Sequence, residues 1–419
     1  MSRTRSTLLL LAFLLVPAAA IRAQIEPDLR ARIDQAIERG VRFQLASLEA
    51  AGERVATGEK ALVLLSLLHS GAATTEEGLL RGLTTIDRPS ASLSTYERAL
   101  RIMVVEALDA RSRDDGRPFP FAAGLMRLAR EDAQALAETQ NPAGAWRYGA
   151  AAASDYDNSC TQYALLGLRS ALNLGFQVSD RVWVKALRHL VSQGRRSGGA
   201  GYQGNDPPSP AMTSGVLSSL LIARVRASMS PDSALVRTSS AQIEGHLAWL
   251  EKNWKPLDGN WGFYAIYGLE RAAALAGVER LGKRDWYREG ALALLEVQMG
   301  DGSWTGQRQA TAFALLFLCR STRARAGETA DPVGFLLGRL GRQSQETEVA
   351  AAVDRLAASG PAILPLLVPY LEAPEARVRE AADRTLRKIT GKGTGFDPAR
   401  DAEANRAAID AWRAIARKP

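Results

Sequence analysis

The sequence has few of the side chains that ordinarily build metal centres and disulfide frameworks. Its 419 residues include only two cysteines, Cys160 and Cys319, and three histidines, His69, His189 and His246. Each cysteine lies in a segment predicted to be a core-facing helix, which favours two separate buried thiols over a single disulfide. None of the histidines has a companion ligand at metal spacing, so we expect no metal and no cofactor.

Basic runs and long apolar runs are also missing. No run of lysine and arginine is interleaved with aromatic residues, so we expect no nucleic-acid partner. Beyond the N-terminal leader, no segment is long and uncharged enough to span a membrane. The leader has Arg3 and Arg5, an apolar run over Leu8–Val16, then Pro17, the small residues Ala18–Ala20 and finally Ile21–Ala23, which is the order of a secretory signal peptide.

We therefore predict a signal peptide over residues 1–23 and export to the periplasm or cell envelope. Cleavage after Ala23 would lower the formal net charge from +8 to about +5 because three arginines leave with the leader. Cleavage after Ala20 fits the small-residue pattern equally well. The alternative is an uncleaved N-terminal anchor. A lipoprotein anchor is disfavoured because no cysteine follows the apolar run.

The rest of the chain has apolar residues at helical spacing, and no segment alternates with the two-residue period of a strand. The first helix of each predicted pair carries charges on one face, whereas the second is apolar nearly all round. Outer helices around inner ones would close into an all-α fold, an α/α toroid, because closure buries the last inner helix against the first. The six predicted pairs are Ile33–Leu48 with Leu62–His69, Gly78–Ile86 with Tyr96–Ala110, Phe121–Thr139 with Thr161–Leu174, Arg181–Gln193 with Thr213–Arg224, Gln242–Asn253 with Trp261–Ala276, and Asp285–Gln298 with Gln309–Arg320.

The pattern changes after the predicted toroid domain, which we assign to residues 24–326, and a linker over 327–343. Residues 344–394 have the spacing of a HEAT-like repeat, with proline-containing breaks between short helices. Residues 395–419 contain a last helix, Ala402–Arg417, whose apolar face should pack on that repeat. We expect this tail to offer a surface for a protein partner. The three helices of the repeat are predicted over Glu346–Ser359, Ala362–Leu371 and Glu375–Ile389.

One turn motif is repeated within the predicted toroid. Gln140–Trp146 and Gln298–Trp304 each have a glutamine, three residues, a glycine, one residue and a tryptophan after an apolar helix. Glycine allows the positive φ that ends a helix, and the tryptophan can fold back over the helix end. Degenerate copies stand at Gly199–Tyr202 and Asp258–Trp261.

These turns, the predicted hairpins and the segments Asp157–Leu168, Gly199–Tyr202 and Ala211–Ser214 resemble the squalene cyclase and protein prenyltransferase repeat superfamily. Within it the chain looks like the exported bacterial toroids that have no assigned reaction. The resemblance covers Ile33–Arg320 and implies the toroid fold. It leaves the function open, because related toroids include cyclases, prenyltransferases, cobalamin carriers and complement thioester domains.

Class II cyclases of this superfamily protonate an alkene with an Asp-x-Asp-Asp motif, whose central acid stays protonated in an apolar pocket. In this chain Asp155 and Asp157 match the motif, whereas Asn158 replaces its last acid. The resemblance therefore implies Asp155 and Asp157 as candidate catalytic acids. The alternative is that Asp157 or Ser159 simply caps the helix that begins near Cys160.

The other chemistries of the superfamily fit less well. Protein prenyltransferases hold zinc through an Asp and a Cys two residues apart and a distant His, but Asp157 and Cys160 are three apart. A Gly-Cys-Gly-Glu-Gln thioester sequence and a Gly-x-Ser-x-Gly nucleophile elbow are absent. A glycan-active toroid needs paired acids on facing loops, and beyond the two aspartates above the chain offers Asp206, Asp258 and Asp301 there.

Aromatic residues fall in the predicted turns at the same ends of the hairpins, so a toroid would gather them at one rim. Aromatic faces can hold an apolar or sugar ligand or stabilise a carbocation. The alternative for Trp146, Trp261 and Trp304 is that they plug turns. The candidate ligand-binding residues are Tyr156, Tyr202, Trp261, Tyr264 and Trp304.

The predicted function is that of an exported toroid that binds a ligand or scaffolds proteins of the cell envelope. Its expected partners are an apolar or small-molecule ligand in the toroid cavity and a protein on the HEAT-like tail. The alternative is a terpene cyclase-like isomerase that protonates a polyene through Asp155 or Asp157.

Overall fold

The computed structural model describes much of the chain between residues 27 and 416. The predicted signal peptide (1–23) lies outside the described residues, as does the predicted linker (327–343) except for Leu337 and Leu340. Within the described part all regular elements are helices, which confirms the all-α prediction. The residues left out between these limits are 51–54, 74, 88, 115–121, 150–154, 196, 228–232, 279, 323–336, 338–339, 341–345 and 358–360.

Helices α2 to α13 alternate between an outer and an inner kind, because the sequence alternates charged and apolar helices. In the inner helices α3, α7, α9, α11 and α13 nearly every side chain is buried. The outer helices are α2 (Pro27–Ala50), α4 (Glu77–Thr85), α6 (Ala122–Glu138), α8 (Asp180–Ser192), α10 (Ala234–Asn253) and α12 (Trp286–Val297). The inner helices are α3 (Thr57–His69), α5 (Thr95–Asp114), α7 (Asn158–Asn173), α9 (Pro210–Arg226), α11 (Gly262–Ala276) and α13 (Arg308–Leu318).

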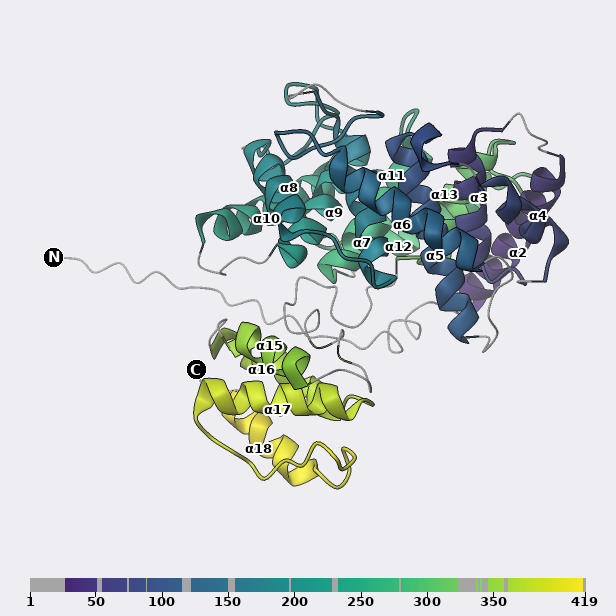
Figure 1. Ribbon diagram of the computed structural model, residues 1–419. Coiled ribbons are helices and arrows are strands. Elements are labelled where there is room, and N and C mark those ends of the chain that lie inside the picture. Colours follow the sequence, from purple (N-terminus) through teal and green to yellow (C-terminus); the bar gives the residue numbers. More distant parts are fainter. Residues whose placement is uncertain are drawn as a thin grey trace.

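The inner helices contact one another in a circular order. Each packs on the next inner helix along the chain, and α13 packs back on α3 and α2. Figure 1 shows this closure, with α13, in green, beside α3, in purple. This circular order leaves no inner helix of the described set without an inner neighbour on either side.

Trp146 and Trp304 fill equivalent places in this ring. Both are fully buried, and each indole Nε1 donates to the carbonyl ten residues earlier, Leu136 at 2.7 Å and Leu294 at 2.9 Å. Each ring therefore covers the end of the outer helix that precedes its turn. The two tryptophans are turn plugs, as one of the two interpretations of the motif predicted.

The glutamines of the two motifs tie neighbouring hairpins together. Gln298 Nε2 donates to the Gly302 carbonyl of its own turn and to the Ala36 carbonyl of α2, each at 2.9 Å. In the same way Gln140 Nε2 reaches the Val182 carbonyl of α8 at 3.0 Å. The motif thus satisfies backbone acceptors of the next outer helix, and its second copy joins the last hairpin to the first.

A threonine one turn into each of three inner helices completes the motif, and we did not predict it. Thr161 and Thr311 Oγ1 accept the backbone N–H groups of the two plug tryptophans. Thr213 Oγ1 accepts from Ala200, two residues after Gly198, whose φ is +79°. The third copy of the turn is therefore centred on Gly198 and has alanine at the plug position.

The C-terminal helices have a hydrophobic core of their own, to which the last helix contributes Ile409 and Trp412. Trp412 Nε1 donates to Asp383 at 3.0 Å, so this helix packs on the preceding ones as predicted. The predicted single helix Ala362–Leu371 is wrong, because Pro365 and Pro369 cannot donate helical hydrogen bonds and divide it into short pieces. The elements are α15 (Glu346–Ala357), η3 (Pro361–Ile363), α16 (Leu364–Leu367), η4 (Val368–Glu372), α17 (Ala376–Thr390) and α18 (Arg406–Ala416).

Candidate functional site

The first two turns of four inner helices, α5, α7, α11 and α13, bring aromatic rings into contact. We call these rings the aromatic series, and neighbouring centroids in it lie 4.4 to 6.3 Å apart. Its two ends are open to solvent, with Tyr148 49% and Trp261 72% exposed, whereas Tyr163 at its centre is 1% exposed. The series contains, in order of contact, Tyr148, Tyr96, Tyr163 and Tyr264, the last of which touches both Trp261 and Phe313.

A buried cation lies on α11, two helical turns after Tyr264. Arg271 of α11 is 1% exposed, and its Cζ is 4.1 Å from the centre of the Tyr267 ring and 5.3 Å from that of Tyr163. None of its side-chain nitrogens has a hydrogen-bond partner among the described residues. A buried guanidinium without a counter-charge is uncommon, because removing it from water is costly.

Within the described part of the chain, two further buried polar atoms also lack a partner: Gln162 Nε2 on α7 and Ser214 Oγ on α9. The Tyr264 hydroxyl donates to the other amide atom of Gln162, Oε1, at 2.9 Å. Such groups in a native protein call for an occupant, whether water or a ligand. The aromatic series, Arg271, Gln162 and Ser214 together form the candidate site.

Glu270, the neighbour of Arg271 in the chain, is engaged elsewhere. Its Oε1 accepts from the Thr322 backbone at 3.0 Å, and its Oε2 accepts from the Thr322 hydroxyl at 2.7 Å. Burial raises the pKa of this carboxyl group to about 7, and the two hydrogen bonds from Thr322 offset only part of that rise.

The raised pKa of Glu270 predicts a pH-dependent stability. The folded protein holds a proton that the unfolded chain, with an ordinary glutamate pKa, has already released between about pH 4.5 and 7. The free energy of unfolding should therefore fall as the pH rises through this window. Between pH 5 and pH 8 we expect wild type to lose about 2 kcal/mol relative to Glu270→Gln. Urea unfolding of both proteins at each pH measures the difference, and parallel pH profiles would contradict it.

Asp157 is the N-cap of α7. Its Oδ1 accepts from the Cys160 backbone at 2.6 Å, and its Oδ2 is 3.0 Å from Arg147 Nη1. The side chain is fully buried, whereas that of Asp155 is 47% exposed, with Oδ2 3.4 Å from Arg147 Nε. The capping interpretation therefore describes the structure.

Of the predicted tyrosines, Tyr264 belongs to the aromatic series and Tyr202 lies beside its exposed end. The Tyr202 hydroxyl is 3.4 Å from that of Tyr148 and 3.5 Å from Arg147 Nη1. Tyr156 points elsewhere. Its ring packs edge-on against His189, and its hydroxyl donates to Gln193, the residue that follows α8. Tyr156 is therefore not brought together with the other candidates.

The two tryptophans predicted to bind a ligand differ completely in their exposure to solvent. Trp304 is a fully buried plug that its indole hydrogen bond holds over α12, and it is not part of the aromatic series. Trp261 precedes α11 and is 72% exposed, so the plug interpretation is wrong for it. Its turn glycine, Gly259, has no atom within contact distance of an added Cβ, unlike the glycines of the plug turns.

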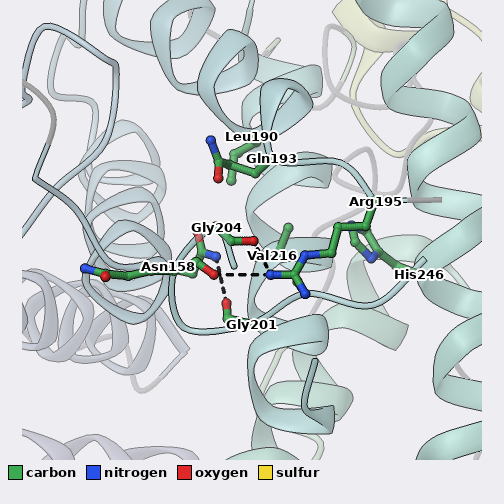
Figure 2. A pocket seen from close by; sticks show the side chains of 10 residues that line it. Asn158, Leu190, Gln193, Arg195, Gly201, Gly204, Val216 and His246 are labelled. Atoms are coloured by element: carbon green, nitrogen blue, oxygen red, sulfur yellow. Dashed lines mark hydrogen bonds between the residues drawn. The ribbon is translucent and has the colours of Figure 1, made fainter. Parts of the chain in front are cut away.

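A small polar hollow lies between α8, α9 and the loop before α9. Figure 2 shows the Asn158 side chain directed at the Gly201 carbonyl and the Arg195 guanidinium at the Gly204 carbonyl. His246 also lines it, with Nδ1 bonded to a backbone carbonyl, and burial lowers the pKa of this histidine. The hollow holds about one water molecule, so it is too small for a substrate.

Metal and disulfide chemistry find no support in the described part of the chain. No group of three His, Cys, Asp or Glu side chains there is placed to hold a metal ion. Cys160 and Cys319 are separate free thiols, as favoured from the sequence, although Cys319 is only half-buried. No helix among the described residues is both long and apolar enough to cross a membrane.

Comparison with known proteins finds neither a matching family model nor a matching curated protein. The site must therefore be argued from its own residues. Sequence reasoning missed Arg271, Gln162 and Ser214. One signal was available, namely the charged pair Glu270-Arg271 within an inner helix that is otherwise apolar, since buried charges are seldom placed without a partner.

Proposed function

We propose that this protein is an exported binding protein of the cell envelope, and that its squalene cyclase-like ring of helical hairpins holds a small apolar ligand at the aromatic series. The observation that carries the proposal is the series itself, which runs from two exposed rings to a fully buried one beside unpaired polar atoms. Apolar walls with a few convergent polar groups are typical of small-molecule sites.

The proposal also includes a protein partner on the C-terminal helices. These helices form a second hydrophobic core, so they are an element distinct from the ring of hairpins. Their surface carries a row of charged side chains, among them Glu346, Arg377 and Arg384, which pair with one another. HEAT-like helices of this kind commonly present an extended surface to partners.

The direct test is to purify the protein from its native envelope and to identify what co-purifies by mass spectrometry. A stoichiometric apolar compound would support the proposal. If the protein carries nothing and binds no apolar compound in solution, the binding function is wrong.

Trp261→Ala gives a sharper test of the aromatic series. Because this indole is 72% exposed, its removal should change the free energy of unfolding by less than about 0.5 kcal/mol. Affinity for the neutral fluorescent probe N-phenyl-1-naphthylamine should fall about 10-fold, the order of one lost aromatic contact. Met299→Ala is the matched control, an exposed apolar residue outside the series. Equal losses of affinity in both variants would argue against the site.

The second candidate function is a terpene cyclase-like isomerase, favoured by the same aromatic rings, whose faces could stabilise a carbocation. The capping role of Asp157 and its ion pair with Arg147 weigh against it. Conversion of squalene by the purified protein, abolished in Asp157→Asn, would establish the enzyme and displace the binding proposal. Asparagine is a good N-cap, so this variant should fold.

A further inference from the structure

The strongest unexplained feature of the molecule is the uncompensated charge of Arg271. Its planar guanidinium carries five N–H donors, and the two tyrosines that flank it supply cation–π contacts and, from the neutral Tyr163 hydroxyl, a polar interaction. These neutral groups offset part of the cost of desolvation, but they do not balance the positive charge. A native protein that retains this arrangement needs an acceptor that is absent from the described residues.

Among the described residues, no neighbouring group serves as an internal counter-ion. Both oxygens of Glu270 are engaged by Thr322, and this carboxyl group holds its proton for part of the time near neutral pH, because its pKa is raised to about 7. Burial also raises the pKa of Tyr163, and that of Tyr267 to about 12, so both phenols stay neutral. The charge must therefore be balanced from outside the described chain.

The other unpaired groups, Gln162 of α7 and Ser214 of α9, are each linked to the face of α11 that carries Arg271. Tyr264, Gly268 and Arg271 lie on one face of α11, at helical spacing. Tyr264 contacts Gln162 of α7, and the Cβ of Ser214 of α9 lies 3.3 Å from where a Cβ on Gly268 would stand. The free atoms, a guanidinium, an amide nitrogen and a hydroxyl, are all able to donate.

We propose that Arg271, Gln162 and Ser214 bind the carboxylate of an apolar monocarboxylic acid, whose hydrocarbon part lies along the aromatic series toward Trp261. The guanidinium fork matches a carboxylate in a bidentate pair. One cation balances one negative charge, whereas a diphosphate would leave net negative charge buried. This inference rests on the proposed binding function and narrows its ligand to a chemical class.

The test compares laurate with dodecanol, which share a chain and differ in charge. Isothermal titration of the full chain should show laurate bound about 30-fold more tightly than dodecanol, the order expected of charge-assisted hydrogen bonds. In Arg271→Met the preference should vanish. The melting temperature of ligand-free Arg271→Met should rise, because the variant removes a buried charge that has no partner. Gln162→Leu, which keeps the arginine, should reduce the preference about 5-fold.

Three results would overturn the inference. Equal affinity of wild type for laurate and dodecanol would show that the ligand need not be an anion, while the protein would still bind apolar compounds. Tighter binding of dodecyl phosphate than of laurate would replace the carboxylate with a phosphate headgroup. A preference for laurate that persists in Arg271→Met would place the anion elsewhere. Failure of the binding function itself is distinguishable, because then neither dodecanol nor N-phenyl-1-naphthylamine would bind.

Discussion

Gly302→Ala is expected to lower the free energy of unfolding by about 4 kcal/mol, more than any surface substitution in this chain. Gly302 has a φ of +89°, where an alanine is strained. An added Cβ would also collide with the Arg39 carbonyl group of α2, coming within 2.8 Å of its carbon and closer still to its oxygen. Backbone cannot move aside as a side chain can, so α2 would have to shift.

Gly175→Ala is the matched control for this prediction. Gly175 also has a positive φ, +84°, but no atom lies within 4 Å of an added Cβ. This variant therefore reports the conformational strain alone, which we expect to be about 1 kcal/mol. Guanidinium unfolding of both variants gives the difference. If the two losses were the same, the close approach of the last turn to α2 would contribute nothing to stability.

The turn glycines show how much of the fold could be predicted from the sequence. The repeated Gln-Gly-Trp spacing predicted where hairpins meet, and its chemistry is the one observed at Trp146 and Trp304. What the spacing could not reveal is the partner across the turn. Gly144, Gly198 and Gly302 each touch the backbone of the next outer helix, and these contacts join residues that are distant in sequence.

The local sequence pattern also gave wrong predictions where a single residue decides the conformation. The stretch from Ala362 to Leu371 is apolar enough for a helix, but two prolines four residues apart interrupt its hydrogen bonds. Trp261 stands two residues after a glycine like the plug tryptophans, yet it is exposed. It lacks the threonine acceptor that stands one turn into α7, α9 and α13, because that position of α11 is Ala265.

The candidate site was predicted only in part, for a related reason. Aromatic residues in turns at the same ends of hairpins must converge if the ring closes, so Tyr264 and Trp261 were within reach of sequence reasoning. Arg271 was not, because its significance lies in what is missing around it. From the sequence alone, Arg271 would be expected to pair with its neighbour Glu270. The structure shows instead that Glu270 bonds to Thr322.

A buried cation that does have its counter-ion offers the second large effect. The Nε and Nη2 atoms of Arg101 in α5 donate to the two carboxylate oxygens of Asp132 in α6, at 2.6 and 2.8 Å. Both side chains are fully buried, and Nη1 also donates to the Ile86 carbonyl at 3.0 Å. We expect Asp132→Ala to lower the free energy of unfolding by about 4 kcal/mol, because it leaves the guanidinium charge without its carboxylate.

Two variants show whether this loss comes from a stranded charge or from lost packing. In Arg101→Met/Asp132→Leu both charges leave together, so most of the stability should return, to within about 1 kcal/mol of wild type. Glu131→Ala changes the residue that precedes Asp132, whose partner Arg127 is exposed, and should change stability by less than about 0.5 kcal/mol. A double variant as unstable as Asp132→Ala would mean that packing, not charge, decides. The ring would then tolerate an unpaired buried arginine, and Arg271 would need no anion to explain it.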